Sequence, residues 1–214
     1  MRIIIKYVEP CLLILVISSI VFQACNNDKT VPCLRGGYSF AVTSEWSPQK
    51  ETYHIGDTIY FISNFPKTMT DQVNTSLSVD YSNSVGIQGD ITIICLDSVA
   101  QRPVLARDSF DLFSVKGNFS ELAGSQNGGI AFNYNETNLN YEFVGAFICQ
   151  KKGIYGIGAG DLSSRGLRGD DCTNAGFTMT VTNSEQHLYL HYNALHVDTT
   201  DIDLRQRGYD FRVE

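Results

Sequence analysis

Apolar residues recur at alternate positions along most of the chain, and this pattern constrains the fold more than any other feature of the sequence. A period of two brings every second side chain to the same face of an extended strand. The pattern predicts strands at residues 38–42, 77–81, 130–134, 177–181, 188–192 and 209–213. Continuous apolar runs at 59–62 and 91–96 predict central strands that are covered on both faces. No segment shows a convincing helical stripe, so we expect an all-β chain.

Short segments rich in glycine, asparagine and charged residues separate the expected strands and are typical of turns. These segments lie at residues 56–57, 88–90, 126–129, 151–153 and 183–186. Roughly eight to ten short strands at this spacing favour an antiparallel β-sandwich that resembles immunoglobulin-like modules. A barrel or a jelly roll is the alternative arrangement for such strands.

The start of the chain has the pattern of an export signal. Arg2 and Lys6 provide positive charge, and residues 11–22 form a mostly apolar run without a charged residue. As a helix this run would reach ~18 Å, which is short of a hydrocarbon core of roughly 30 Å. A signal peptide is therefore expected. The alternative, an uncleaved anchor helix, would have to extend back through Glu9 and Pro10.

The apolar run is followed by Phe22-Gln23-Ala24-Cys25, in which a small residue precedes a cysteine. This motif resembles a lipobox, and with the polar residues 26–29 it resembles the signals of Bacteroidota cell-envelope lipoproteins. The resemblance implies a lipid on Cys25 and a location at the outer membrane, on its periplasmic or cell-surface face. The predicted organisation is a lipoprotein signal peptide at 1–24, a polar tether at 25–37 and a single β-sandwich domain at 38–214.

Four further cysteines follow the anchor: Cys33, Cys95, Cys149 and Cys172. An even number in an oxidising compartment predicts two disulfides, and four cysteines allow three connectivities. Their positions favour Cys33–Cys95 and Cys149–Cys172, because the second pair closes only a modest loop. The alternative is Cys95–Cys149 across the two sheets, with Cys33–Cys172 outside them. A zinc site is disfavoured because the chain contains no Cys-x-x-Cys spacing.

Histidines and aspartates provide the other possible metal ligands. His187, His191 and His196 cluster in the sequence, but on the expected strand the first two would lie ~13 Å apart, too far to share one ion. Calcium would require oxygen ligands from loops, and the aspartates lack the spacing of an EF-hand loop; they are Asp161, Asp170, Asp171, Asp201 and Asp203. We expect neither a metal nor a cofactor.

Two segments outside the expected strands are candidate recognition sites. Trp46 is the single tryptophan of the chain, and an aromatic side chain in a loop can stack on a sugar. Trp46 is therefore a candidate ligand-binding residue, although capping of the core is the plainer interpretation. Arg168-Gly169-Asp170 matches the tripeptide that integrins bind. A match of three residues carries little weight by itself.

The composition and motifs limit the function. A net charge of −7 argues against a nucleic-acid partner. The chain contains neither a Gly-x-Ser-x-Gly elbow nor a phosphate-binding glycine loop. The leading hypothesis is a non-enzymatic lipoprotein that binds a glycan or an envelope protein. A carbohydrate-active enzyme on a β-sandwich, with paired carboxylates, is the alternative. A purely structural envelope component is the third.

Overall fold

The computed structural model describes residues 37–121, 129–170, 172–184, 186–196 and 208–214. They belong to the compact unit Gly36–Glu214, and the other unit, Met1–Arg35, lies outside the described residues. The first strands are β1 (Tyr38–Ser47), β2 (Thr52–Tyr53), β3 (Thr58–Pro66), β4 (Thr68–Thr70), β5 (Ser78–Asp80), β6 (Ile87–Asp97), β7 (Arg102–Leu105) and β8 (Phe110–Lys116). The later strands are β9 (Asn118–Glu121), β10 (Ile130–Asn133), β11 (Asn135–Glu136), β12 (Asn140–Cys149), β13 (Gly153–Ala159), β14 (Leu162–Ser164), β15 (Ala175–Val181) and β16 (Gly208–Val213). The described helices are the 3-10 helix η1 (Arg107–Ser109) and the α-helix α2 (Leu188–Leu195).

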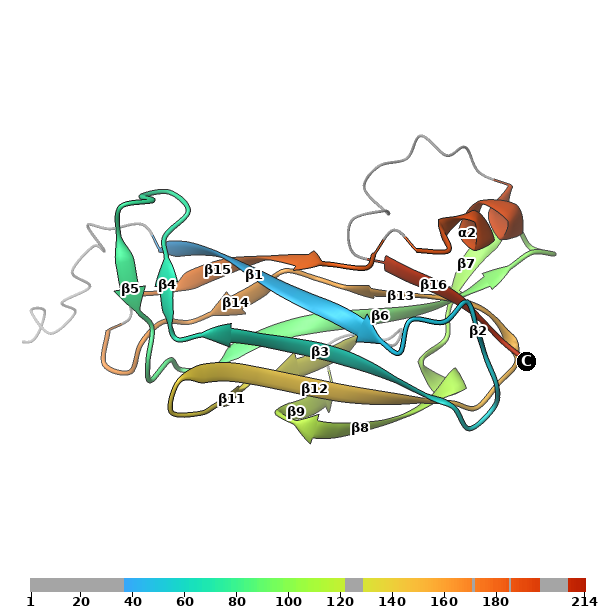
Figure 1. Ribbon diagram of the computed structural model, residues 1–214, viewed down its shortest axis with the longest axis horizontal. Coiled ribbons are helices and arrows are strands. Elements are labelled where there is room, and N and C mark those ends of the chain that lie inside the picture. Colours follow the sequence, from blue (N-terminus) through green and yellow to red (C-terminus); the bar gives the residue numbers. More distant parts are fainter. Residues whose placement is uncertain (1–36, 122–128, 171, 185, 197–207) are drawn as a thin grey trace, which may run out of the picture. The chain divides into compact units, whose positions relative to one another are not determined.

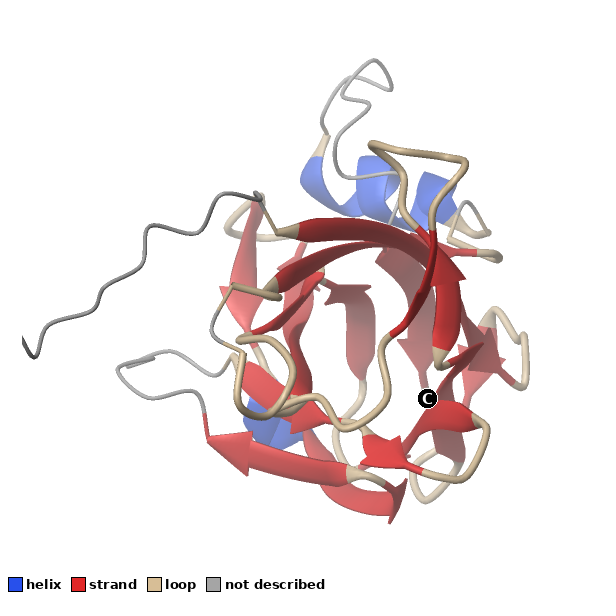
Figure 2. Ribbon diagram, turned by 90° about the vertical axis from the view of Figure 1, so that its left-hand side faces the viewer, coloured by secondary structure: helices blue, strands red, loops and turns tan. Residues whose placement is uncertain are grey.

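The strands form an all-β sandwich, as the alternation predicts (Figure 1). One layer contains β8, β12, β3 and the end of β1, and the other contains the start of β1 followed by β15, β14, β6, β13 and β16. Strand β1 joins the layers because it pairs first with β15 and then, from Ser44 onward, with β3. The β1–β15 and β16–β2 pairs are parallel, so the sheet is mixed and not purely antiparallel. Figure 2 shows the strands curving around the core.

Aromatic side chains fill the space between the layers. Phe132 of β10 and Phe143 of β12 come from opposite layers, and their ring centroids lie 4.4 Å apart. Phe61 of β3 contacts the Phe132 ring at 5.7 Å. All three side chains are fully buried, and each contributes roughly 1.5–3 kcal/mol through removal of its apolar surface from water. Apart from Trp46, the largest fully buried side chains are all phenylalanines and tyrosines.

The predicted strand at 188–192 is wrong, because this segment is the helix α2. A short apolar run fits either period, and the buried residues Leu190, His191, Ala194 and Leu195 follow the helical one. The helix lies on the outer side of β6 and β13, where Ala194 and Leu195 pack with Leu96 and against Ile94 and Ile154. Tertiary packing therefore decides the conformation of this segment. Within the described residues no helix is both long and apolar enough to cross a membrane.

The predicted turn at 88–90 is also wrong, because β6 continues through these residues. A Cβ atom on Gly89 would lie 2.5 Å from Cδ2 of Leu162 and 2.7 Å from Cζ of Phe132. Gly89 is thus a position of close packing inside a strand. By contrast, the turn expected at 56–57 is present, and Gly56 has a φ of +90°. The segment 126–129 falls almost entirely outside the described residues.

Candidate binding face

Trp46 is not a ligand-binding residue. It lies inside β1, its side chain is 0% exposed, and its ring is 4.7 Å from Phe61 and 5.5 Å from Phe147. Asn183 holds its backbone from both sides: the Trp46 amide donates to Oδ1 at 3.1 Å, and Nδ2 donates to the Trp46 carbonyl at 2.7 Å. The alternation that begins at Phe40 continues to residue 46, which directs the indole inward. The core interpretation of Trp46 is therefore confirmed.

Both predicted disulfide connectivities fail, because Cys95 and Cys149 are free thiols. Cys95 lies opposite Tyr155 and Cys149 lies opposite Phe110, and these two rings pack on each other with centroids 5.0 Å apart. Burial raises the pKa of the Cys149 thiol to about 12, so this side chain acts as a small apolar core residue. Sequence position alone does not reveal such packing.

Cys172, Cys33 and Cys25 are the remaining cysteines for which a disulfide or a lipid was predicted. Cys172 is disulfide-bonded, and its bond does not go to either of the other cysteines that the structure describes. A bond between Cys172 and Cys33, which formed part of the alternative connectivity, stays a prediction because Cys33 lies outside the described residues. Lipidation of Cys25 stays a prediction for the same reason.

Two residues of the histidine cluster, His187 and His191, contact the buried residue Asp210. Asp210 of β16 is 4% exposed, and its Oδ1 lies 3.8 Å from Nδ1 of His191 on α2. Nδ1 of His187 lies 3.2 Å from the Asp210 carbonyl oxygen. In the described ranges no group of three or more histidine, cysteine, aspartate or glutamate side chains is arranged to hold a metal ion. Of the calcium candidates, Asp171, Asp201 and Asp203 lie outside those ranges.

Asp210→Asn is expected to stabilise the domain at neutral pH. Burial raises the pKa of Asp210, and the two histidines offset this only in part. Because the folded-state pKa is higher than the unfolded one, stability is fully present below the unfolded pKa and is lost as pH rises through the folded pKa. Asparagine carries no charge at any pH in this range, so the variant does not lose this stability as pH rises. Denaturant titrations of both proteins between pH 4 and pH 8 should show curves that diverge as pH rises, and parallel curves would contradict this.

The layer formed by β8, β12, β3 and the end of β1 carries apolar side chains on its solvent side. We call this surface the outer face. Side chains on this surface lie next to one another across the strands β8, β12 and β3. Phe113 lies opposite Ala146, Ala146 opposite Tyr60, and Val144 opposite Ile62. The outer face comprises Tyr60, Ile62, Phe113, Val115, Val144 and Ile148. Ala146 lies in the same row as Phe113 and Tyr60 but is 0% exposed.

Two side chains of the outer face are widely exposed, Phe113 by 48% and Val115 by 53%. The register between β12 and β8 shifts at Val144 and Gly145, so that Ser114 pairs with Gly145 and Lys116 pairs with Val144. Val115 is the extra residue of this β-bulge. Bulges bend a strand and re-aim its side chains, and this one adds an aliphatic side chain to the exposed surface.

The continuous run 59–62 gave the sequence signal for this face, because it predicts cover on both sides of β3. On the inner side Ile59 and Phe61 are fully buried, as predicted. On the outer side Tyr60 and Ile62 are only half-buried. The equivalent run in β6 differs, since α2 covers Leu96 on the outer side. The run 59–62 is therefore fully buried on one side of β3 and only half-buried on the other.

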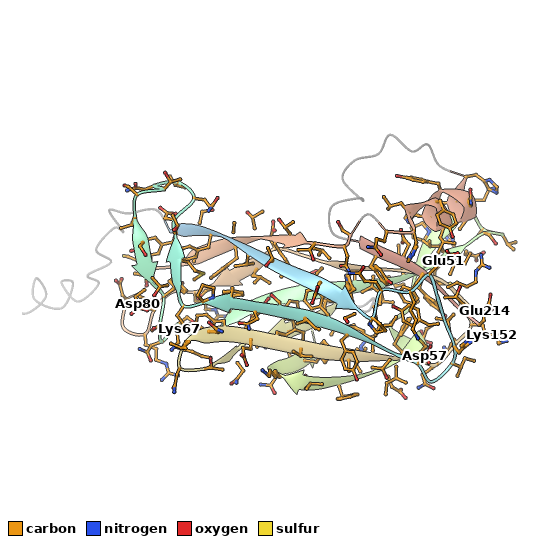
Figure 3. All side chains as sticks on the ribbon, in the orientation of Figure 1. Glu51, Asp57, Lys67, Asp80, Lys152 and Glu214 are labelled. Atoms are coloured by element: carbon orange, nitrogen blue, oxygen red, sulfur yellow. The ribbon has the colours of Figure 1, made fainter. Side chains whose placement is uncertain are left out.

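Charged groups border the outer face. Glu45 lies opposite Ile62 and Asp111 opposite Ile148, and both are exposed. Nζ of Lys116 lies 2.7 Å from Oε2 of Glu142, which leaves this ion pair close to neutral. Figure 3 shows further charged side chains at the two ends of the domain, with Lys67 and Asp80 at one end and Glu51, Asp57, Lys152 and Glu214 at the other. The outer face is thus an apolar surface with an acidic border.

Comparisons with known proteins identify no family. No protein-family model matches the chain, and no curated protein matches it. Among solved structures, AvmM, which catalyses macrocyclization in alchivemycin A biosynthesis, is 13% identical, with 80% of this chain and 88% of AvmM covered and a TM-score of 0.37. A type II cohesin domain from the cellulosome of Acetivibrio cellulolyticus is 12% identical, with coverage of 65% and 91% and a TM-score of 0.32. The second type II cohesin module of the ScaA scaffoldin from the same organism is 12% identical, with coverage of 68% and 94% and a TM-score of 0.30. Likenesses this distant carry no argument about what the chain binds.

Proposed function

We propose that the chain is a lipid-anchored cell-envelope module that binds a protein partner through the outer face. The observation that carries the proposal is the exposure of Phe113 and Val115 on β8, on the same layer as the half-buried Tyr60 and Ile62 of β3. Exposed apolar patches bordered by polar residues mark interaction sites. Aromatic residues at the centre of such a patch commonly supply most of the binding energy. The anchor is the lipid expected on Cys25.

The charges on the chain indicate the kind of partner. The border of the outer face carries Glu45 and Asp111, which are exposed, and the chain has a net charge of −7. A second copy of the chain would bring like charges together, and an anionic lipid surface would do the same. A protein with an apolar centre and basic side chains around it complements this surface. Trp46 no longer supports a glycan ligand, because its side chain is buried.

Site-specific photo-crosslinking tests the proposal. A photoreactive amino acid replaces Phe113 in the full-length chain in its native cells, and a control replaces Val73, which is 83% exposed outside the outer face. We expect residue 113 to capture one defined protein that residue 73 does not capture. Adding Val144→Glu should lower this yield roughly tenfold or more, because a charge then enters the centre of the interface.

Several results would contradict the proposal. Equal capture from residues 113 and 73 would show that the outer face is not selective. Capture of a second copy, or of lipid or glycan alone, would identify a different kind of ligand. A yield that Val144→Glu leaves unchanged would show that the captured protein does not lie on the outer face.

A further inference from the structure

We infer that the turn Arg168-Gly169-Asp170 is a second recognition site, for a receptor that binds a carboxylate through a divalent cation and a guanidinium through an acidic pocket. This site lies between β14 and β15, away from the outer face, at the end of the domain that carries β4 and β5 (Figure 1). The inference does not depend on the proposed function of the outer face. It rests on the shape of the turn, on its supports and on the exposure of its side chains.

The three residues form the tip of a closed turn. The Asp170 amide donates to the Leu167 carbonyl at 3.1 Å, which closes the four residues from 167 to 170. Gly169 has a φ of +84°, close to the value that a type II turn requires at its third position. Other residues rarely adopt this angle. Glycine at 169 is therefore what allows Arg168 and Asp170 to flank such a tight tip.

Hydrogen bonds to the rest of the domain hold the turn in place. The Arg168 amide donates to the Asn83 carbonyl at 3.1 Å, and the Leu167 amide donates to Oγ1 of Thr173 at 2.7 Å. The hydroxyl of Tyr81, a core residue, donates to the Thr173 carbonyl at 2.8 Å. A turn that is held in one conformation before binding loses less conformational entropy when a receptor binds it.

The side chains at the tip are available to a partner. Arg168, Gly169 and Asp170 are all exposed, and no described residue forms an ion pair with the Arg168 guanidinium. Oδ1 of the Asp170 carboxylate accepts a hydrogen bond of 3.0 Å from the Cys172 amide. This bond orients the carboxylate and leaves its second oxygen, Oδ2, to coordinate a cation. Hard divalent cations prefer carboxylate oxygens as ligands. The guanidinium suits paired hydrogen bonds with carboxylates.

A solid-phase assay tests this inference with a purified RGD-binding integrin ectodomain as the probe and the purified mature chain as the ligand. We expect binding in Mn²⁺ that is lost in EDTA and is displaced by a linear RGD peptide. Asp170→Glu keeps the charge but moves the carboxylate by one methylene, so we expect binding to weaken roughly tenfold or more. Asp80→Glu, at another exposed position of the same end, should leave binding unchanged.

We expect Asp170→Glu to unfold at the same temperature as the wild type, as measured by thermal unfolding. Any loss of binding then reflects the site and not the fold. Absence of metal-dependent binding by the wild-type chain would overturn the inference. Binding that Asp170→Glu and Arg168→Ala both leave at the wild-type level would overturn it as well, because the receptor would then contact another part of the chain.

Discussion

Trp46→Ala is expected to lower the free energy of unfolding by about 3–5 kcal/mol, as large-to-small substitutions of buried tryptophans do. The indole is 0% exposed and packs between Phe61 and Phe147, with Tyr209 at 6.4 Å. Its Nε1 has no hydrogen-bond partner among the described residues, so the expected loss comes from packing and from the cavity that remains. Denaturant unfolding monitored by circular dichroism gives the difference.

Two matched variants sharpen this test. Trp46→Phe keeps an aromatic ring and removes the unpaired N–H, so its loss should be clearly smaller than that of Trp46→Ala. Val73→Ala changes a side chain that is 83% exposed and should shift stability by less than about 0.5 kcal/mol. Because Trp46 is the single tryptophan, its fluorescence should resist quenching by acrylamide. A Trp46→Ala protein as stable as the wild type would show that residue 46 is not part of the core.

Cys25→Ala is expected to abolish lipid attachment completely, because the thiol that would carry the acyl chains is removed. Each buried methylene contributes ~0.8 kcal/mol to membrane binding, so the loss of two or three acyl chains converts stable anchoring into none. Mass spectrometry of the wild-type N-terminal peptide should show an acylated Cys25. In the variant we expect uncleaved precursor or soluble protein.

Cys11→Ala is the matched control, because this cysteine lies in the segment that signal cleavage would remove. It should leave both the mature N-terminus and the acylation unchanged. An unmodified wild-type N-terminus, or one that begins at a residue other than Cys25, would contradict the lipobox interpretation and with it the anchoring part of the proposed function.

The alternation of apolar residues predicted the strands because each inward position meets the same apolar core. In β15, Phe177, Met179 and Val181 are buried and the residues between them are exposed, as a period of two requires. The same reasoning failed at α2, because a run of eight residues satisfies both periods and only its packing on Leu96 selects the helix. Local pattern predicts an element well when one face alone is buried.

The candidate site was less accessible to sequence reasoning. Trp46 was expected in a loop because β1 was predicted too short, and the strand in fact continues to Ser47. Cys95 and Cys149 are free thiols on separate strands. The rings opposite them, Tyr155 and Phe110, pack on each other. The sequence does not reveal such tertiary contacts, so it could not predict that both thiols stay free. The run 59–62 did contain the signal for the outer face, but only the structure shows that Tyr60 and Ile62, on the outer side of β3, are half-buried while Ile59 and Phe61 are fully buried.

The affinity of the mature chain for the protein captured at residue 113 tests the central claim most directly. Isothermal titration should be carried out with the wild type, with Phe113→Ala and with the control Val73→Ala. If the outer face is the binding surface, truncation of its most exposed aromatic side chain removes a hot spot worth about 2 kcal/mol or more, which corresponds to roughly 30-fold weaker binding. Val73→Ala should bind as the wild type does. Equal affinity of the wild type and Phe113→Ala would contradict the account.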